Sequence, residues 1–129
     1  MRITLCGSTR FKDEFERLNR KLSLMGHVVY SVACFGHSGD DLTEAQKATL
    51  DKVHMAKIDN SDAIVVINVG GYIGHSTLCE VAYANLSNKC ILFLECGWPP
   101  ELAPYGRKMC HFPGCNNDML TGPCALCYE

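Results

Sequence analysis

The stretch DAIVVINV, residues 62–69, is the most strand-like part of the sequence. Its run of apolar residues lacks the polar alternation of a strand with one face in water, which is typical of a central strand in a parallel sheet. It leads directly into GGYIGHSTLCEVAYA, residues 70–84, where glycines precede a helix-like pattern. A buried strand, a glycine-rich turn and a helix in this order indicate a parallel α/β fold.

The rest of the first 95 residues alternates in the same way. Apolar segments predict further strands at 3–6 (ITLC), 27–33 (HVVYSVA) and 90–95 (CILFLE). Helical periodicity or capping signals predict helices over about 11–25, 43–59 and 77–88, and Thr43 and Gln46 have the spacing of a capping box. We therefore expect an α/β domain over residues 1–95, with a flavodoxin- or Rossmann-like parallel sheet of four to five strands flanked by helices.

The composition is that of a soluble globular protein. The chain has 129 residues, enough for one domain, with 47% hydrophobic and 20% charged residues. A formal net charge of −2 makes nucleic acid an unlikely partner. No apolar run approaches the length of a membrane span or of a signal-peptide core, so we expect a cytoplasmic protein without membrane association. The nine cysteines, an odd and scattered set, indicate reduced thiols.

Residues 96–129 differ in composition. A connector rich in proline and glycine precedes a short tail that contains Cys110, Cys115, Cys124 and Cys127. The spacing of these four cysteines resembles that of a zinc knuckle, which predicts a structural zinc site in the tail. The alternative is a set of free thiols in a loosely packed segment.

Two loops carry residues suited to ligand binding at the sheet edge. In CGSTR, residues 6–10, Gly7 permits a tight turn, while Ser8 and Arg10 are candidates to hold an anion. The alternative is a simple glycine turn followed by a helix cap. In the second loop, Tyr72 could stack on a base or pack on the neighbouring loop.

The glutamate of the second loop, Glu80, allows two interpretations. Thr77 and Glu80 match a capping box, which would make Glu80 a helix cap. Helical spacing also places Glu80 away from the apolar face of its helix, where it could act as a nucleophile on a sugar. His54 lies one helical turn from Asp51, so this pair could serve acid–base chemistry or be an ordinary surface pair.

Three segments resemble the nucleoside 2-deoxyribosyltransferase superfamily, which includes the 2'-deoxynucleoside 5'-phosphate N-hydrolases. They are CGSTRF near the start, HMAKIDNSDAIVVINV in the middle, and GGYIGHSTLCEVAYA followed by NKCILFLE. The similarity covers residues 1–95 in matching order and spacing. It implies cleavage of a nucleoside or nucleotide N-glycosidic bond, or deoxyribosyl transfer, without a cofactor for catalysis.

The resemblance also implies roles for individual residues. Glu80 matches the nucleophile that forms a covalent glycosyl intermediate, and Asp51 matches the acid that assists the base. Gly7, Ser8 and Arg10 match the loop that holds the nucleoside or its phosphate. Family members commonly assemble, so a homo-oligomer is expected.

The chain departs from the family pattern at one position. Six residues before the nucleophile the family has a polar residue, where this chain has Gly74, although Ser76 and Thr77 are nearby candidates for phosphate contact. A non-catalytic nucleotide-binding module and an enzyme resembling an NAD glycohydrolase are therefore the alternative functions.

Overall fold

The computed structural model describes residues 1–36, 39 and 41–95. The predicted connector and tail, with the four cysteines of the zinc hypothesis, lie outside the described residues. Along the chain the elements are β1 (Arg2–Gly7), the 3-10 turn η1 (Thr9–Phe11), α1 (Lys12–Leu24), β2 (Val28–Tyr30), α2 (Glu44–Asp59), β3 (Ala63–Ile67), the 3-10 turn η3 (Val69–Gly71), α3 (His75–Leu86) and β4 (Cys90–Phe93).

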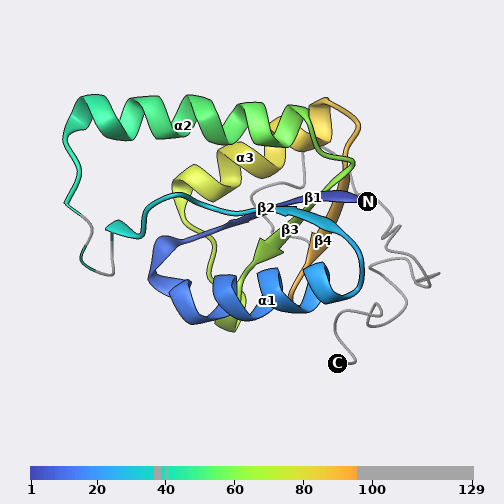
Figure 1. Cartoon of the computed structure of the whole chain (residues 1–129). Coiled ribbons are helices and arrows are strands. Elements are labelled where there is room, and N and C mark those ends of the chain that lie inside the picture. Colours follow the sequence, from blue (N-terminus) through green and yellow to red (C-terminus); the bar gives the residue numbers. More distant parts are fainter. Residues whose placement is uncertain (37–38, 40, 96–129) are drawn as a thin grey trace.

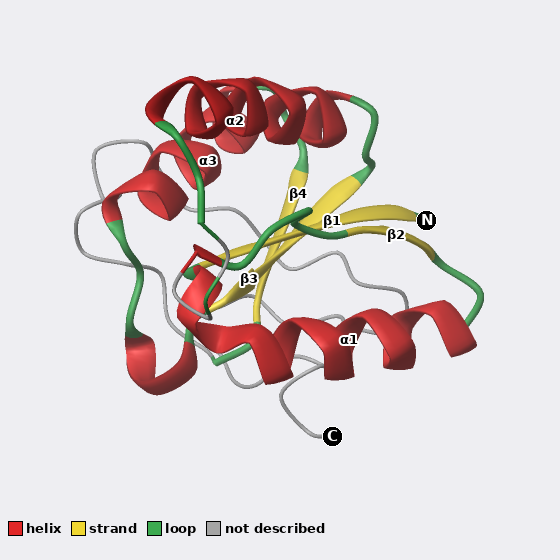
Figure 2. Cartoon of the chain, turned by 60° about the vertical axis from the view of Figure 1, so that its left-hand side comes forward, coloured by secondary structure: helices red, strands yellow, loops and turns green. Residues whose placement is uncertain are grey.

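The four strands form one parallel sheet with the order β2-β1-β3-β4. Helix α1 covers one face of the sheet, and α2 and α3 together cover the other (Figures 1 and 2). This arrangement confirms the predicted α/β class, with four strands, and its strand order is that of the flavodoxin-like folds. Within the described part of the chain, every helix is too short or too polar to cross a bilayer.

The core is divided by the sheet into two apolar layers, because successive residues of a strand point to opposite faces. On the α1 side, side chains from β1, β3 and β4 pack against Phe15, Leu18 and Leu22. On the other side, the alternate residues of the same strands pack against Ile58 of α2 and Val81 of α3. All five residues of β3 are buried, as its unbroken apolar sequence predicts.

The sequence predicts capping boxes at the starts of two helices, at Thr43 and Gln46 and at Thr77 and Glu80. At the start of α2 the box is present, since Thr43 and Gln46 each bond to the other's backbone N–H. At α3 the expected box is wrong, because the helix begins two residues earlier, with Gly74 as its N-cap. Thr77 is therefore inside the first turn, with a buried side chain, and Glu80 lies in the second turn.

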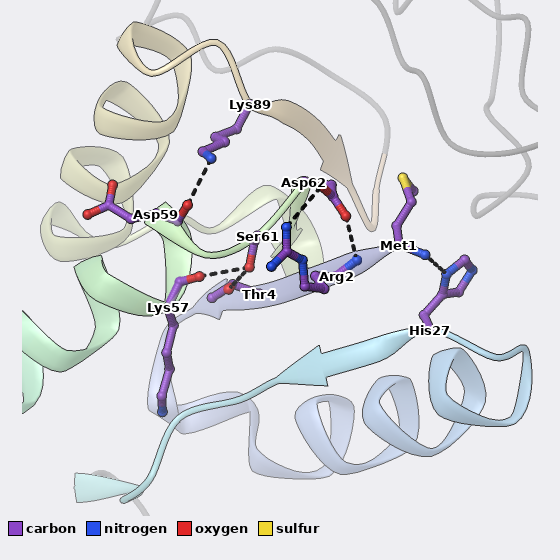
Figure 3. A network of polar contacts seen from close by, with 9 residues as sticks. All are labelled: Met1, Arg2, Thr4, His27, Lys57, Asp59, Ser61, Asp62 and Lys89. Carbon is purple, nitrogen blue, oxygen red and sulfur yellow. Dashed lines mark hydrogen bonds and ion pairs between the residues drawn. The ribbon is translucent and has the colours of Figure 1, made fainter.

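A network of polar contacts joins the elements near the amino ends of β1 and β3 (Figure 3). The buried Thr4 hydroxyl lies 2.5 Å from Ser61 Oγ, which donates to the carbonyl of Lys57 at 2.8 Å. At the surface, the backbone N–H of Arg2 donates to the carboxylate of Asp62 at 2.8 Å. These contacts satisfy buried hydroxyls and fix the end of α2 against β1.

Candidate active site

The sheet has its topological switch point between β1 and β3. The chain leaves β1 toward α1 on one face and leaves β3 toward α3 on the other, which opens a crevice at the carboxyl ends of these strands. A cavity of about 680 Å³ lies there, between the loops after β1 and β3, the segment after β2, helix α2 and the start of α3. This is the position in which open α/β sheets bind their ligands.

The cavity collects most of the residues that the sequence nominated. Its lining includes Gly7, Ser8, Asp51, His54, Tyr72, Gly74, Ser76, Thr77 and Glu80. Arg10 is the exception among the nominated residues of the described chain. Sequence reasoning missed several further lining residues, notably Val32, Asp41, Lys47, Leu50 and Val53. In the sequence these residues are distinguished only by their positions, after the second strand or along α2. Which side of α2 faces the cavity can be known only from the packing of the helix.

Arg10 is engaged at the rim of the cavity rather than in its lining. Its Nε donates to Ser8 Oγ at 3.1 Å, and its Nη2 donates to the Tyr72 hydroxyl at 3.1 Å. The guanidinium also lies 4.1 Å from the centre of the Tyr72 ring, and Phe11 meets that ring edge-on. Tyr72 therefore packs on the neighbouring loop, one of its two expected arrangements, and links the loops after β1 and β3.

Glu80 projects from α3 into the cavity with a side chain that is only 16% exposed. Its Oε2 is buried and has no hydrogen-bond partner among the described residues. Burial raises the pKa of Glu80 to about 7, and the negative charge of Asp51 adds to the rise, while a contact with the Cys6 thiol opposes it. A carboxylate that water solvates this poorly is more costly to ionise and more reactive once ionised.

His54 contacts Glu80 from the facing helix, with His54 Nε2 3.6 Å from Glu80 Oε2. Burial lowers the pKa of His54 to about 4, and the charge of Lys57 contributes, against an opposing effect of Asp51. Between about pH 4 and 7 both His54 and Glu80 are thus uncharged, and their contact is not an ion pair. At neutral pH, His54 is a neutral imidazole.

Cys6, at the carboxyl end of β1, completes this cluster. Its Sγ lies 3.5 Å from His54 Nε2. Burial, followed by the charge of Glu80, raises the pKa of the Cys6 thiol well above its usual value, so the thiol is protonated at neutral pH. A cysteine in a buried strand usually serves as a small hydrophobe. Cys6 does belong to the core, but its sulfur also faces the side chains of His54 and Glu80.

The amino end of α3 forms one wall of the cavity. Its N-cap is Gly74, without a side-chain cap, and no acidic residue occupies its first turn. The backbone N–H groups of this turn, with the nearby Ser76 hydroxyl, form a polar surface of the kind that accepts an anionic group.

No protein-family model matches the chain, and neither does any curated protein sequence. The fold and the site define its class: a flavodoxin-like α/β protein with a cavity of mixed polar and apolar lining at the switch point of a four-stranded parallel sheet.

Proposed function

We propose that the protein cleaves the N-glycosidic bond of a nucleoside or nucleotide, with Glu80 as the nucleophile. The observation that carries this proposal is the position of the Glu80 carboxylate: its Oε2 is buried, has no hydrogen-bond partner among the described residues, and lies in the cavity that Asp51 and His54 also line. Within the described part of the chain this carboxylate has no evident structural role, since it does not cap α3 and its contact with the uncharged His54 is not an ion pair at neutral pH.

The reaction follows the two-step course of retaining glycosidases. The Glu80 oxygen attacks the anomeric carbon of the sugar, so that a carbon–oxygen bond forms as the bond to the base nitrogen breaks. Asp51 protonates the departing base or orients it. Water then attacks the same carbon as the bond to the Glu80 oxygen breaks, and it gives up one proton, which balances the proton that the base has gained and completes hydrolysis. A second base in place of water gives deoxyribosyl transfer.

The size and polarity of the cavity suit this substrate class. A volume of about 680 Å³ lies within the range of small-molecule sites, and both polar and apolar side chains line it. Leu50 and Val53 offer an apolar wall for a base, while Ser8, Ser76 and the first turn of α3 offer donors for a sugar or a phosphate. The resemblance to the nucleoside 2-deoxyribosyltransferase superfamily favours the same class, and with it a cytoplasmic homo-oligomer.

The test is release of free base from a panel of deoxynucleosides and their 5'-monophosphates, followed by chromatography. Glu80→Gln should lower the rate by at least about a thousandfold, because loss of a covalent nucleophile removes the reaction path itself. Acid quenching during turnover should trap one deoxyribosyl group on the peptide that contains Glu80. The matched control is Glu16→Gln, which changes an exposed glutamate of α1 on the opposite face of the sheet and should keep full activity.

Three outcomes would contradict the proposal. Base release that persists undiminished in Glu80→Gln would exclude the nucleophile. A ligand-dependent rise in melting temperature without any base release would indicate a nucleotide-binding module. Release of nicotinamide from NAD, without activity on any deoxynucleoside, would place the protein with the NAD glycohydrolases.

A further inference from the structure

Three side chains that commonly bind metal ions converge beside the cavity, and two of them, His54 and Glu80, line it. Cys6 comes from the end of β1, His54 from α2 and Glu80 from α3, so each is held by a different element of regular structure. Their candidate ligand atoms (Sγ, an imidazole nitrogen and a carboxylate oxygen) all lie within 4.8 Å of one another. All three side chains are buried or nearly so, unlike the exposed acidic clusters that occur on many protein surfaces.

Two of the three distances between the candidate ligand atoms match the edges of a tetrahedral zinc site. Zinc bond lengths of about 2.3 Å to sulfur, 2.0–2.1 Å to nitrogen and 2.0–2.2 Å to oxygen give tetrahedral edges of about 3.6 Å from sulfur to nitrogen and about 3.4 Å from nitrogen to oxygen. The observed separations are 3.5 Å from Cys6 Sγ to His54 Nε2 and 3.6 Å from His54 Nε2 to Glu80 Oε2. The third edge, from Cys6 Sγ to a Glu80 carboxylate oxygen, is at most 4.8 Å, and adjustment of these two side chains can bring it to the roughly 3.6 Å that a tetrahedral ion requires.

The chemistry of the three groups selects the kind of ion. A thiolate with an imidazole and a carboxylate is a donor set for zinc and similar borderline-soft divalent ions, rather than for magnesium or calcium. One thiolate and one carboxylate also neutralise the two positive charges, as a buried site requires. Three protein ligands leave a fourth position for a water molecule or a substrate atom, and two of the three, His54 and Glu80, line the cavity.

We propose that Cys6, His54 and Glu80 form a binding site for Zn²⁺ or a similar transition-metal ion. Binding replaces the proton of the Cys6 thiol, which passes to solvent, and gives a ligand bond to Glu80 Oε2, which has no hydrogen-bond partner among the described residues. The site is separate from the zinc knuckle expected in the tail. It does not depend on the proposed N-glycosidase activity, but it competes with that activity, because a metal-bound Glu80 oxygen is not free to attack a sugar.

The experiment uses the full chain with Cys110, Cys115, Cys124 and Cys127 changed to serine, so that the tail cannot bind the probe through thiolates. Co²⁺ is the probe, since it takes tetrahedral nitrogen and sulfur sites as Zn²⁺ does and reports sulfur ligation by a charge-transfer band. Titration should give one Co²⁺ per chain with that band, and Zn²⁺ should displace it. Cys6→Ser should abolish the band.

Two further variants and one control complete the test. His54→Ala and Glu80→Gln should each weaken Co²⁺ binding by at least about tenfold, a loss that even outer-shell substitutions can cause. Cys79→Ser is the matched control, because Cys79 lies 3.7 Å from His75 on the exposed side of α3 and forms a cysteine–histidine pair outside the cluster. This control should bind Co²⁺ like its parent.

Circular dichroism establishes whether each variant is folded. If Cys6→Ser does not fold, the loss of Co²⁺ binding in His54→Ala is the test of the metal site. Absence of stoichiometric Co²⁺ binding, or binding that Cys6→Ser and His54→Ala leave unchanged, would overturn the metal site. Base release is measured separately in the presence of a chelator. Failure of the N-glycosidase proposal would therefore appear in that assay alone, and failure of the metal site in the titration alone.

Discussion

Substitution of Glu80 by glutamine should stabilise the protein, and increasingly so as the pH rises. Glutamine keeps the shape of the side chain but removes a charge that the fold solvates poorly, with only 16% of the Glu80 side chain exposed. Residues that serve chemistry in a cavity often cost stability in this way.

The magnitude follows from the pKa of Glu80, which rises from 4.5 to about 7 on folding. At 1.36 kcal/mol per pKa unit, this rise corresponds to roughly 3 kcal/mol of destabilisation once the group is ionised in both states. Below pH 4.5 both states are protonated and the penalty is absent. Between 4.5 and 7 the unfolded state loses its proton first, so the free energy of unfolding falls as the pH rises. Above about pH 7 the penalty is complete.

Urea unfolding followed by circular dichroism, with a chelator present, measures this effect between pH 4 and 8. Glu80→Gln and the wild type should be nearly equal at pH 4, and the variant should be more stable by about 2–3 kcal/mol at pH 8. Glu16→Gln, at an exposed position, should stay within about 0.5 kcal/mol of the wild type. A difference that does not vary with pH, or a variant that is less stable at pH 8, would refute the reasoning.

Three further predictions concern the framework. Gly7→Ala should lower the free energy of unfolding by about 1–3 kcal/mol in urea, since its new Cβ would lie 2.9 Å from the Ile67 carbonyl oxygen in the central sheet. Phe15→Ala should lower it by about 3–5 kcal/mol in the same assay, because the ring is fully buried. Asp62→Asn should be less stable than the wild type near neutral pH but equal to it in strong acid. The reason is that the backbone N–H of Arg2 bonds to the Asp62 carboxylate and lowers its pKa below 3.8. The stability that the ionised carboxylate contributes is lost as the pH falls through this lowered pKa. Acid unfolding curves that stay parallel would contradict the last of these.

The sequence predicts the fold well where a local pattern has one interpretation. The apolar run of β3 and the alternation of strands and helices suffice for a parallel sheet, and the capping box at Thr43 locates the start of α2. At α3 the local pattern has two interpretations. The pair Thr77 and Glu80 has capping spacing, yet the glycine-rich turn ends at Gly74 and the helix begins there. The position of the glycine-rich turn, and not the capping-box spacing of Thr77 and Glu80, therefore determines where α3 begins.

The candidate site was less accessible to sequence reasoning. Most nominated residues line the cavity because parallel strands bring their following loops to one edge of the sheet. The contact of Cys6 with His54 could not be predicted, since it joins residues 48 positions apart through the packing of α2 on β1. Arginine is a common anion-binding residue, which made Arg10 a candidate, but its guanidinium donates hydrogen bonds to Ser8 and Tyr72 instead.

The contact between Arg2 and Asp62 in Figure 3 lies at the amino ends of β1 and β3, whereas the cavity lies at their carboxyl ends. From Arg2 to Gly7 the chain advances about 16 Å at 3.3 Å per residue, beyond the range at which substitutions usually influence one another. Substitutions at Arg2 or Asp62 and substitutions in the cavity should therefore have nearly additive effects on stability. The cavity can accordingly accept new ligand-binding residues while the contact between Arg2 and Asp62 continues to hold the amino ends of the two strands together.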